Sequence, residues 1–275
     1  MLTDYHVHLR PDERDATPER FFTSENAQRY RAAAEERGIA QLGVAEHIYR
    51  FRQALEVWDH PFWSTWAVDD LDEYCEFVRG ETDLCLGIEA DFVPGREDRM
   101  ANLLEARDWD YVVGSVHFVG EDSLDSEEFS IWLGTEPPER IWARYFDMLA
   151  ESARSGLFDI LAHPDLVKVW GKDRPLPEGD LRRFYYRAME AIADVDVAIE
   201  VSTAGWRKPV GEIYPAPAFL EMAIDAGKPL ALSSDAHVPD QIGHRYADAV
   251  ELLESLGVKE IAVFDRRQRR MEPLG

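Results

Sequence analysis

Short apolar runs alternate with longer amphipathic segments along the chain. The short runs are rich in β-branched residues and predict strands, whereas the longer segments repeat apolar positions every three or four residues and predict helices. We expect strands at residues 2–8, 40–46, 84–90, 111–116, 159–162, 195–202, 230–234 and 260–264. We expect helices at residues 24–37, 71–79, 96–106, 138–155, 180–193, 217–226 and 245–255, with Ser24 as an N-cap and Gly38, Gly156, Gly227 and Gly257 as C-caps.

This alternation indicates a parallel sheet with helical crossovers. Seven or eight strand–helix units, with no repeat or linker between them, predict one α/β domain over residues 1–275. A chain of this length suits closure of the sheet into a TIM-like barrel. An open doubly wound sheet is the alternative, but no Gly-rich phosphate loop follows the first strand.

Two insertions follow strands on the face where a barrel carries its chemistry. Residues 49–70 are aromatic and residues 120–137 are acidic and include Trp132. We expect both insertions to form lids or rims around a pocket. The aromatic residues have a second interpretation, as a plug for the barrel end; they are Phe51, Trp58, Phe62, Trp63 and Trp66.

The composition limits the partners. A net charge of −24 repels polyanions, so we expect no nucleic-acid partner, and the basic cluster at residues 266–270 is interpreted as a solvated tail. An anionic substrate would need a local positive centre such as bound metal. No apolar run reaches the roughly 20 residues of a membrane span, and charged residues interrupt the amino terminus. We therefore expect a cytoplasmic protein without a membrane partner, and free thiols at Cys75 and Cys85.

Histidines gather at one place in the predicted fold. Six of the eight lie at or just beyond the carboxyl end of a predicted strand: His6, His8, His47, His117, His163 and His237. A single histidine in such a place is usually a core or capping residue. Because parallel strands of a barrel converge at one mouth, six together predict a shared site.

Carboxylates reinforce this pattern. Glu46, Glu89, Asp165 and Asp235 also close predicted strands, and Asp91 follows two residues after Glu89. Nitrogen and oxygen ligands without a thiolate suit zinc, manganese or iron. The ligands outnumber those that one ion can use, so we expect two or three divalent ions with a bridging carboxylate such as Glu89.

The motifs DYHVH, EH, GIEADF, SVHF, AHPD and SSDAH, in that order, resemble the PHP (polymerase and histidinol phosphatase) superfamily of metal-dependent phosphoesterases. TAGWRKPVGEIYP and HPDLVK are most similar to its monofunctional histidinol-phosphate phosphatases. The resemblance implies a distorted (β/α)7 barrel. It also implies hydrolysis of L-histidinol phosphate to L-histidinol and phosphate by a metal-bridging hydroxide. A nucleotide or another small phosphate ester is the alternative substrate.

The resemblance further implies a ligand set. His6, His8, Glu89 and Asp235 would surround one ion, Glu89 with His117 and His163 a second, and His47 with His237 a third. The family usually places one more ligand in the loop after the first strand. That loop has no histidine here, so Asp12 is the candidate and Asp15 the reserve. Glu46 is either a ligand or, as we favour, an acceptor that fixes a histidine tautomer.

The remaining assignments concern the substrate. Arg207, Lys168 and Lys208 are expected to hold the phosphate, and Ser115 to contact the substrate. Glu89 and His237 are expected to take part in catalysis, and Asp165 to protonate the leaving alkoxide or pair with a substrate amine. Glu200 is either a contact of the substrate or a paired structural acid.

Two other classes of protein stay open. One is a metal-binding regulatory or proofreading module, and the other is an amidohydrolase-like barrel, which usually needs a metal-bridging lysine that this chain lacks at a strand end. The sequence leaves the oligomeric state open.

Overall fold

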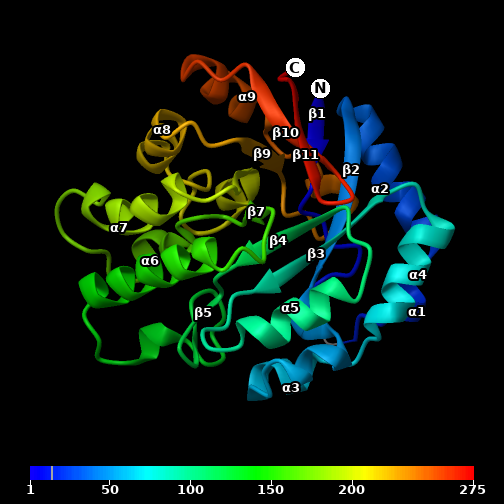
Figure 1. Cartoon of the computed structure of the whole chain (residues 1–275), viewed down its shortest axis with the longest axis horizontal. Helices are drawn as coiled ribbons and strands as arrows, with labels where there is room; N and C mark the ends of the chain where they lie inside the picture. Colours follow the sequence, from blue (N-terminus) through cyan, green and yellow to red (C-terminus); the bar gives the residue numbers. More distant parts are fainter. Residues whose placement is uncertain (14) are drawn as a thin grey trace.

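Seven parallel strands form the central sheet of the computed structural model, which describes residues 1–13 and 15–275 (Figure 1). Their order in the sheet follows the chain. The strands are β1 (Leu2–Asp4), β2 (Ile39–His47), β3 (Cys85–Asp91), β4 (Tyr111–Ser115), β7 (Ile160–Leu161), β8 (Ala198–Ser202) and β9 (Leu230–Ser233). The predicted α/β class is confirmed.

The sheet nearly closes on itself, between β1 and β9. These two strands are joined just beyond their carboxyl ends, where Val7 and Ala236 form a parallel bridge and the backbone N–H of His8 donates to the carbonyl of Ala236 at 2.8 Å. The closure therefore lies beside the site that the histidines predict. The result is the expected distorted barrel of seven strands.

Helices cover the outside of the barrel (Figure 1). They are α1 (Pro18–Phe21), α2 (Ser24–Glu36), α3 (Pro61–Trp66), α4 (Leu71–Glu81), α5 (Glu97–Glu105), α6 (Pro138–Arg154), α7 (Arg182–Ala193), α8 (Pro217–Asp225) and α9 (Tyr246–Ser255). The four predicted C-cap glycines have φ of 69° to 83°, as expected for helix ends. The predicted N-cap Ser24 was wrong by one residue: the Thr23 side chain accepts from the Asn26 N–H at 3.2 Å.

Small residues make room for an aromatic ring inside the barrel. A Cβ at Gly43 or Gly87 would lie 2.3 Å from the nearest atom of the Tyr111 side chain. Tyr111 is fully buried there, and its hydroxyl donates to the Val44 carbonyl at 3.0 Å. These two glycines are therefore required by close approach.

The carboxyl terminus differs from the prediction. Residues 260–264 do not add an eighth parallel strand; β10 (Glu260–Asp265) pairs antiparallel with β11 (Gln268–Pro273). The hairpin lies beside both chain ends (Figure 1), and it is tied to the barrel because the Phe264 N–H donates to the Tyr5 hydroxyl at 3.0 Å. The basic cluster is not a free tail, since Arg267 Nε donates to Asp159 Oδ2 at 2.9 Å.

The two insertions carry small elements of their own. The 3-10 turns η1 (Ile48–Arg50) and η2 (Arg52–Glu56) lie with α3 in the first, and the short hairpin β5 (Phe118–Val119) and β6 (Asp122–Ser123) leads into the second. Both cysteines are free and half-buried. Within the described part of the chain, no helix is long and apolar enough to span a bilayer.

Candidate metal centre

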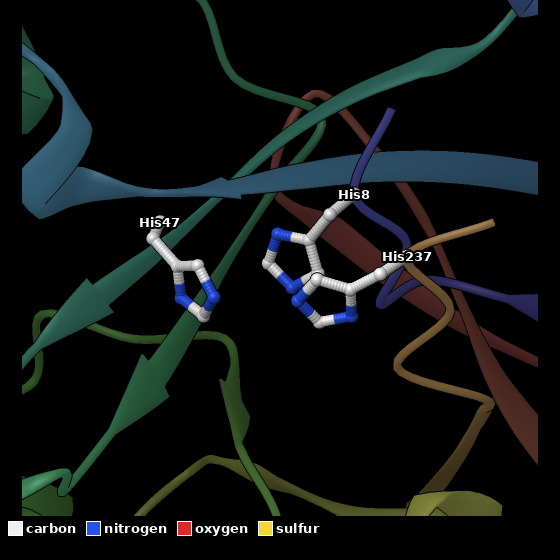
Figure 2. Close-up of side chains that lie close together, drawn as sticks. All are labelled: His8, His47 and His237. Carbon is white, nitrogen blue, oxygen red and sulfur yellow. The ribbon is translucent and has the colours of Figure 1, made fainter. Parts of the chain in front are cut away.

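The carboxyl ends of the strands bring the six predicted histidines into one buried cluster. His6 and His8 follow β1, His47 ends β2, and the other three follow β4, β7 and β9. Figure 2 shows His8 between His47 and His237. The ring centroid of His8 lies 4.1 Å from that of His47 and 4.3 Å from that of His237.

Glu89 at the end of β3 lies at the middle of this cluster, and its two oxygens face different histidines. Oε1 is 3.1 Å from His163 Nε2 and 3.3 Å from His117 Nε2. Oε2 is 3.3 Å from His6 Nε2, and it also contacts His47 Nδ1. A carboxylate placed in this way can bridge two cations.

Asp235 and Asp12 lie at the edge of the cluster. Asp235 Oδ1 is 3.4 Å from His8 Nε2 and 3.8 Å from His6 Nε2. Asp12 Oδ2 is 2.9 Å from His237 Nε2, and Oδ1 is 3.7 Å from His47 Nε2. The reserve candidate Asp15 is exposed and lies 3.8 Å from Arg20, so the structure brings Asp12 and not Asp15 to the histidines.

The residues present fit a group of divalent cations. Several buried ligand atoms have no hydrogen-bond partner among the described residues: His6 Nε2, both ring nitrogens of His8, His47 Nδ1, Glu89 Oε2 and His237 Nε2. Such atoms are costly unless something binds them. Four trios have ligand atoms within 4.8 Å of one another: His8–His47–His237, His6–His8–Asp235, His6–Glu89–His163 and His47–Glu89–His117. These trios share His6, His8 and His47, which the predicted grouping had assigned to one ion each.

Buried carboxylates outside the cluster hold its histidines. Glu200 accepts from His6 Nδ1 at 2.7 Å and from the backbone N–H of His163. Asp91 accepts from His117 Nδ1 at 2.8 Å. The two bonds to Nδ1 leave Nε2 of His6 and of His117 facing Glu89, each 3.3 Å from a Glu89 oxygen. Glu200 is thus a paired structural acid in this structure, the second of its two interpretations.

Glu46 also faces away from the cluster. It accepts from the Leu9 N–H at 2.7 Å and pairs with the buried guanidinium of Arg50, while His8 Nδ1 is 3.8 Å away. Arg50 in turn pairs with Asp12. Reasoning from the sequence missed Arg50 and left Asp91 out of the site; the spacing of Asp91 from Glu89 on one strand face was the available signal.

The electrostatics place Glu89 and His47 in the forms that bind cations. Burial raises the pKa of the Glu89 carboxyl, but the adjacent His47 and His6 outweigh it and hold the pKa well below its usual range. Burial lowers the pKa of His47 to about 3, and Glu89 offsets only part of that. Ionised carboxylates and neutral imidazoles are the metal-ligating species. Burial lowers the pKa of His6, His8 and His117, but the neighbouring carboxylates outweigh it and raise the pKa of all three, so a cation must displace protons from these rings.

The backbone is unusual at the same place. His163, Asp165 and Asp235 have φ of 25°, 88° and 49°, a region that side chains rarely adopt. Residues held in such conformations concentrate at functional sites. Here the turns after β7 and β9 set the directions of His163 and Asp235.

A cleft of about 240 Å³ opens over the cluster. Its wall includes Tyr49, Phe62 and Trp66 from the aromatic insertion, whereas Phe51 and Trp63 are buried in the core, so each interpretation of the insertion holds for part of it. The acidic insertion also contributes Ser123, Asp125 and Ser126 to the wall.

The predicted substrate residues divide into two groups. Lys208 lines the cleft, and it is the only lysine or arginine among the described lining residues. Arg207 instead donates to the backbone carbonyls of Ser234 and Asp235, both at 2.8 Å. Ser115 is fully buried and does not line the cleft. The structure therefore does not bring Arg207 or Ser115 to the substrate space.

Lys168 and Asp165 also lie outside the lining of the cleft. They form a buried ion pair at 2.9 Å, and Lys168 Nζ also pairs with Glu212 at 2.6 Å. Burial raises the pKa of Asp165 to about 7, although Lys168 opposes the shift. Neither side chain lines the cleft, because the turn after β7 directs both toward residues 212–216.

Fold and site together define a metal-binding β/α barrel with its ligands at the carboxyl ends of the strands. The PHP domain model matches residues 23–204. The chain is 34% identical over 279 residues to a probable histidinol-phosphatase of Deinococcus radiodurans, and the match covers 99% of each chain. The chain therefore belongs to the PHP family.

Two further proteins are similar to this chain. A probable histidinol-phosphatase of Schizosaccharomyces pombe is 25% identical over 218 residues, which cover 71% of this chain and 69% of the relative. The crystal structure of the Lactococcus lactis histidinol phosphate phosphatase, complexed with zinc, L-histidinol and phosphate, superposes with a TM-score of 0.70 at 16% identity and covers 98% of each chain. That likeness shows the shared fold.

Proposed function

We propose that this protein is a metal-dependent phosphomonoesterase that hydrolyses L-histidinol phosphate to L-histidinol and phosphate. The observation that carries the proposal is the position of the Glu89 carboxylate between two pairs of histidines. One oxygen lies 3.1 Å from His163 and 3.3 Å from His117, and the other lies 3.3 Å from His6 and contacts His47. The full-length similarity to a probable histidinol-phosphatase supports the choice of substrate.

The cluster would hold two or three divalent ions, of zinc, manganese or iron. Glu89 would bridge two of them, and Asp12 with His47 and His237 would hold a third. When bound, such ions polarise a phosphoryl oxygen and lower the pKa of water toward about 7, so that hydroxide is available at neutral pH. His237 and Glu89 would take part in catalysis as ligands of these ions.

The chain's own residues would select and orient the ester. Lys208 at the cleft wall would contact the phosphate as a point charge. A cleft of about 240 Å³ suits a small phosphate ester, and the net charge of −24 disfavours polyanions. The expectation of a cytoplasmic enzyme without nucleic-acid or membrane partners belongs to this proposal.

A panel of phosphate esters tests the substrate. Protein loaded with zinc or manganese should release phosphate from L-histidinol phosphate at least about tenfold more efficiently than from nucleotides, because the small cleft accepts the smaller ester better. Comparable kcat/KM values for nucleotides would instead support the broader phosphoesterase. The His6→Ala variant should lose bound metal and turnover together, whereas His244→Ala, outside the cluster, should keep both.

A further inference from the structure

The side chain of Tyr214 has a hydroxyl that nothing in the described protein satisfies. The residue is 1% exposed, and the hydroxyl oxygen is sealed from solvent without a hydrogen-bond partner among the described residues. Buried tyrosines elsewhere in the barrel use their hydroxyls: that of Tyr145 accepts from the Asp165 N–H at 3.0 Å. A buried hydroxyl left unpaired is unfavourable, so its retention calls for a ligand.

Tyr214 borders the substrate cleft. Its ring centroid lies 6.2 Å from that of the cluster residue His163, and the ring forms part of the wall that also includes Asp125 and Asp235. Both of these carboxylates act on the hydroxyl electrostatically. The wall already contains acceptors in its carboxylates and donors in Ser123, Ser126 and Lys208. The phenol adds an uncharged donor, which can bind an anionic phosphoryl oxygen.

The backbone around Tyr214 is held on both sides. The N–H of Tyr214 donates to the Ser202 carbonyl at 3.0 Å, and the Ser202 N–H donates to the Tyr214 carbonyl at 2.7 Å. These bonds tie the segment to the carboxyl end of β8. They fix the position of the ring along the cleft wall.

The buried Asp165–Lys168 pair holds the same segment from the other side. Lys168 Nζ donates to the Ile213 carbonyl at 2.8 Å and lies 5.3 Å from the centroid of the Tyr214 ring. Asp165 Oδ2 accepts from the Ala216 N–H at 2.8 Å. The pair thus contacts the residues on each side of Tyr214, and this arrangement accounts for two charged residues that the cleft itself does not use.

We infer that the Tyr214 hydroxyl donates a hydrogen bond to a phosphoryl oxygen of the bound ester, and that Asp165 and Lys168 are positioning residues for that donor. The inference rests on the proposed phosphomonoesterase function and names a substrate contact within it. No proton is transferred in this role, since the phenol only donates a hydrogen bond. Its contribution is to orient the phosphate and to offset its charge.

The test is Tyr214→Phe in metal-loaded protein, with Tyr111→Phe as the matched control, because Tyr111 is buried inside the barrel and bonds only backbone. A hydrogen bond to a charged group corresponds to a change of about 10- to 100-fold. We therefore expect Tyr214→Phe to lower kcat/KM by about that factor and to raise the inhibition constant of inorganic phosphate about tenfold. We expect no rise in the inhibition constant of L-histidinol and no fall in the metal content or the melting temperature.

Three results would overturn the inference. These are an unchanged phosphate inhibition constant, a larger effect on L-histidinol than on phosphate, and an equal loss in Tyr111→Phe. The positioning role is tested by the double change Asp165→Asn with Lys168→Met. With Tyr214 present, this change should reduce kcat/KM strongly. In protein that already carries Tyr214→Phe, it should reduce kcat/KM by less than about threefold, because the donor that it positions is gone. Full additivity would contradict it.

The outcome can be separated from the proposed function. If the wild-type protein hydrolyses other phosphomonoesters but not L-histidinol phosphate, the substrate proposal fails. The role of Tyr214 can then still be tested with the same Tyr214→Phe variant, using p-nitrophenyl phosphate as substrate and inorganic phosphate as inhibitor. If L-histidinol phosphate is hydrolysed and Tyr214→Phe behaves like the wild type, only the inference fails.

Discussion

Buried carboxylates around the cluster determine which nitrogen of each histidine faces the cations. Glu200 accepts from Nδ1 of His6 and Asp91 accepts from Nδ1 of His117, so Nε2 of both rings is turned toward Glu89. A ring held in this way loses less freedom when a cation binds. The affinity for metal therefore depends on residues that never touch it.

Asp91→Asn tests this dependence. The amide has the same shape but no negative charge, so it polarises His117 less and no longer favours one ring orientation strongly. We expect about tenfold weaker retention of metal at the Glu89–His117 side, within the range of about 10- to 100-fold for such partners. The measurement is metal content after dialysis against graded chelator concentrations. The exposed Asp122→Asn should match the wild type, and equal retention by Asp91→Asn would contradict the argument.

The places of the clustered histidines and acids could be predicted from the sequence, but the directions of the nearby charged residues Asp165 and Lys168 could not. A histidine or acid at a strand's carboxyl end lies at the mouth of the barrel whatever the other contacts are, so His47, Glu89 and His163 were found. Asp165 and Lys168 follow the same strand end, yet a φ of 88° at Asp165 turns both toward residues 212–216. That direction depends on partners more than 40 residues away in the chain.

At the scale of elements, the strands of the barrel depend on glycines that admit Tyr111. Gly87→Ala would place a methyl group 2.3 Å from the ring of Tyr111, which is fully buried. We expect a loss of roughly 3 kcal/mol or more in the free energy of unfolding, as for overpacked cores at the severe end. Gly80→Ala in α4 meets nothing within 4 Å and should gain about 0.5–1 kcal/mol from the lower backbone entropy of the unfolded chain. Urea denaturation of both variants measures the difference, and equal stabilities would refute it.

The hairpin of β10 and β11 shows where reading the elements from the sequence failed. Residues 260–264 have the composition of a buried strand, and four of them are buried. Composition does not show whether such a strand joins the parallel sheet after a helical crossover or forms an antiparallel hairpin. The hairpin partner β11 is polar, so it has no apolar pattern that would predict a strand. The turn residues Arg266 and Arg267 have φ of 47° and 61°, which glycine or asparagine would normally signal.

Arg267→Ala tests how that hairpin is attached. Its guanidinium holds Asp159 at 2.9 Å and the Leu157 carbonyl at 2.8 Å, and Asp159 is mostly buried. Removing the arginine leaves a buried carboxylate without its partner, so we expect a loss of about 1–3 kcal/mol in the free energy of unfolding. Arg266→Ala is the matched control in the same turn and should change stability by less than about 0.5 kcal/mol. Identical denaturation midpoints for the two variants would show that the pair does not anchor the hairpin.

At the scale of the whole molecule, folding concentrates acidic and metal-ligating groups at one place, although the chain as a whole is already strongly negative. The chain has a net charge of −24, yet Glu89, Asp235 and Asp12 come together at the barrel mouth from segments that are far apart in sequence. The closure between β1 and β9 lies at the same mouth, through Val7 and Ala236. Cations bound there would join the first and last strands of the sheet and neutralise the acids that folding concentrates.

Metal removal should therefore lower the stability of the entire barrel. A ligand that binds only the folded state at about 100 times its dissociation constant contributes about 2.7 kcal/mol. At about 2–4 °C per kcal/mol for a domain of this size, zinc or manganese should raise the melting temperature of chelator-treated protein by about 5–10 °C. His6→Ala should abolish this rise because His6 belongs to two of the four ligand trios, whereas His244→Ala should keep it. Scanning calorimetry of the apo and reloaded forms measures the shift. A melting temperature that does not respond to metal, in protein that retains its fold, would mean that the histidines and acids at the barrel mouth do not form a cation site.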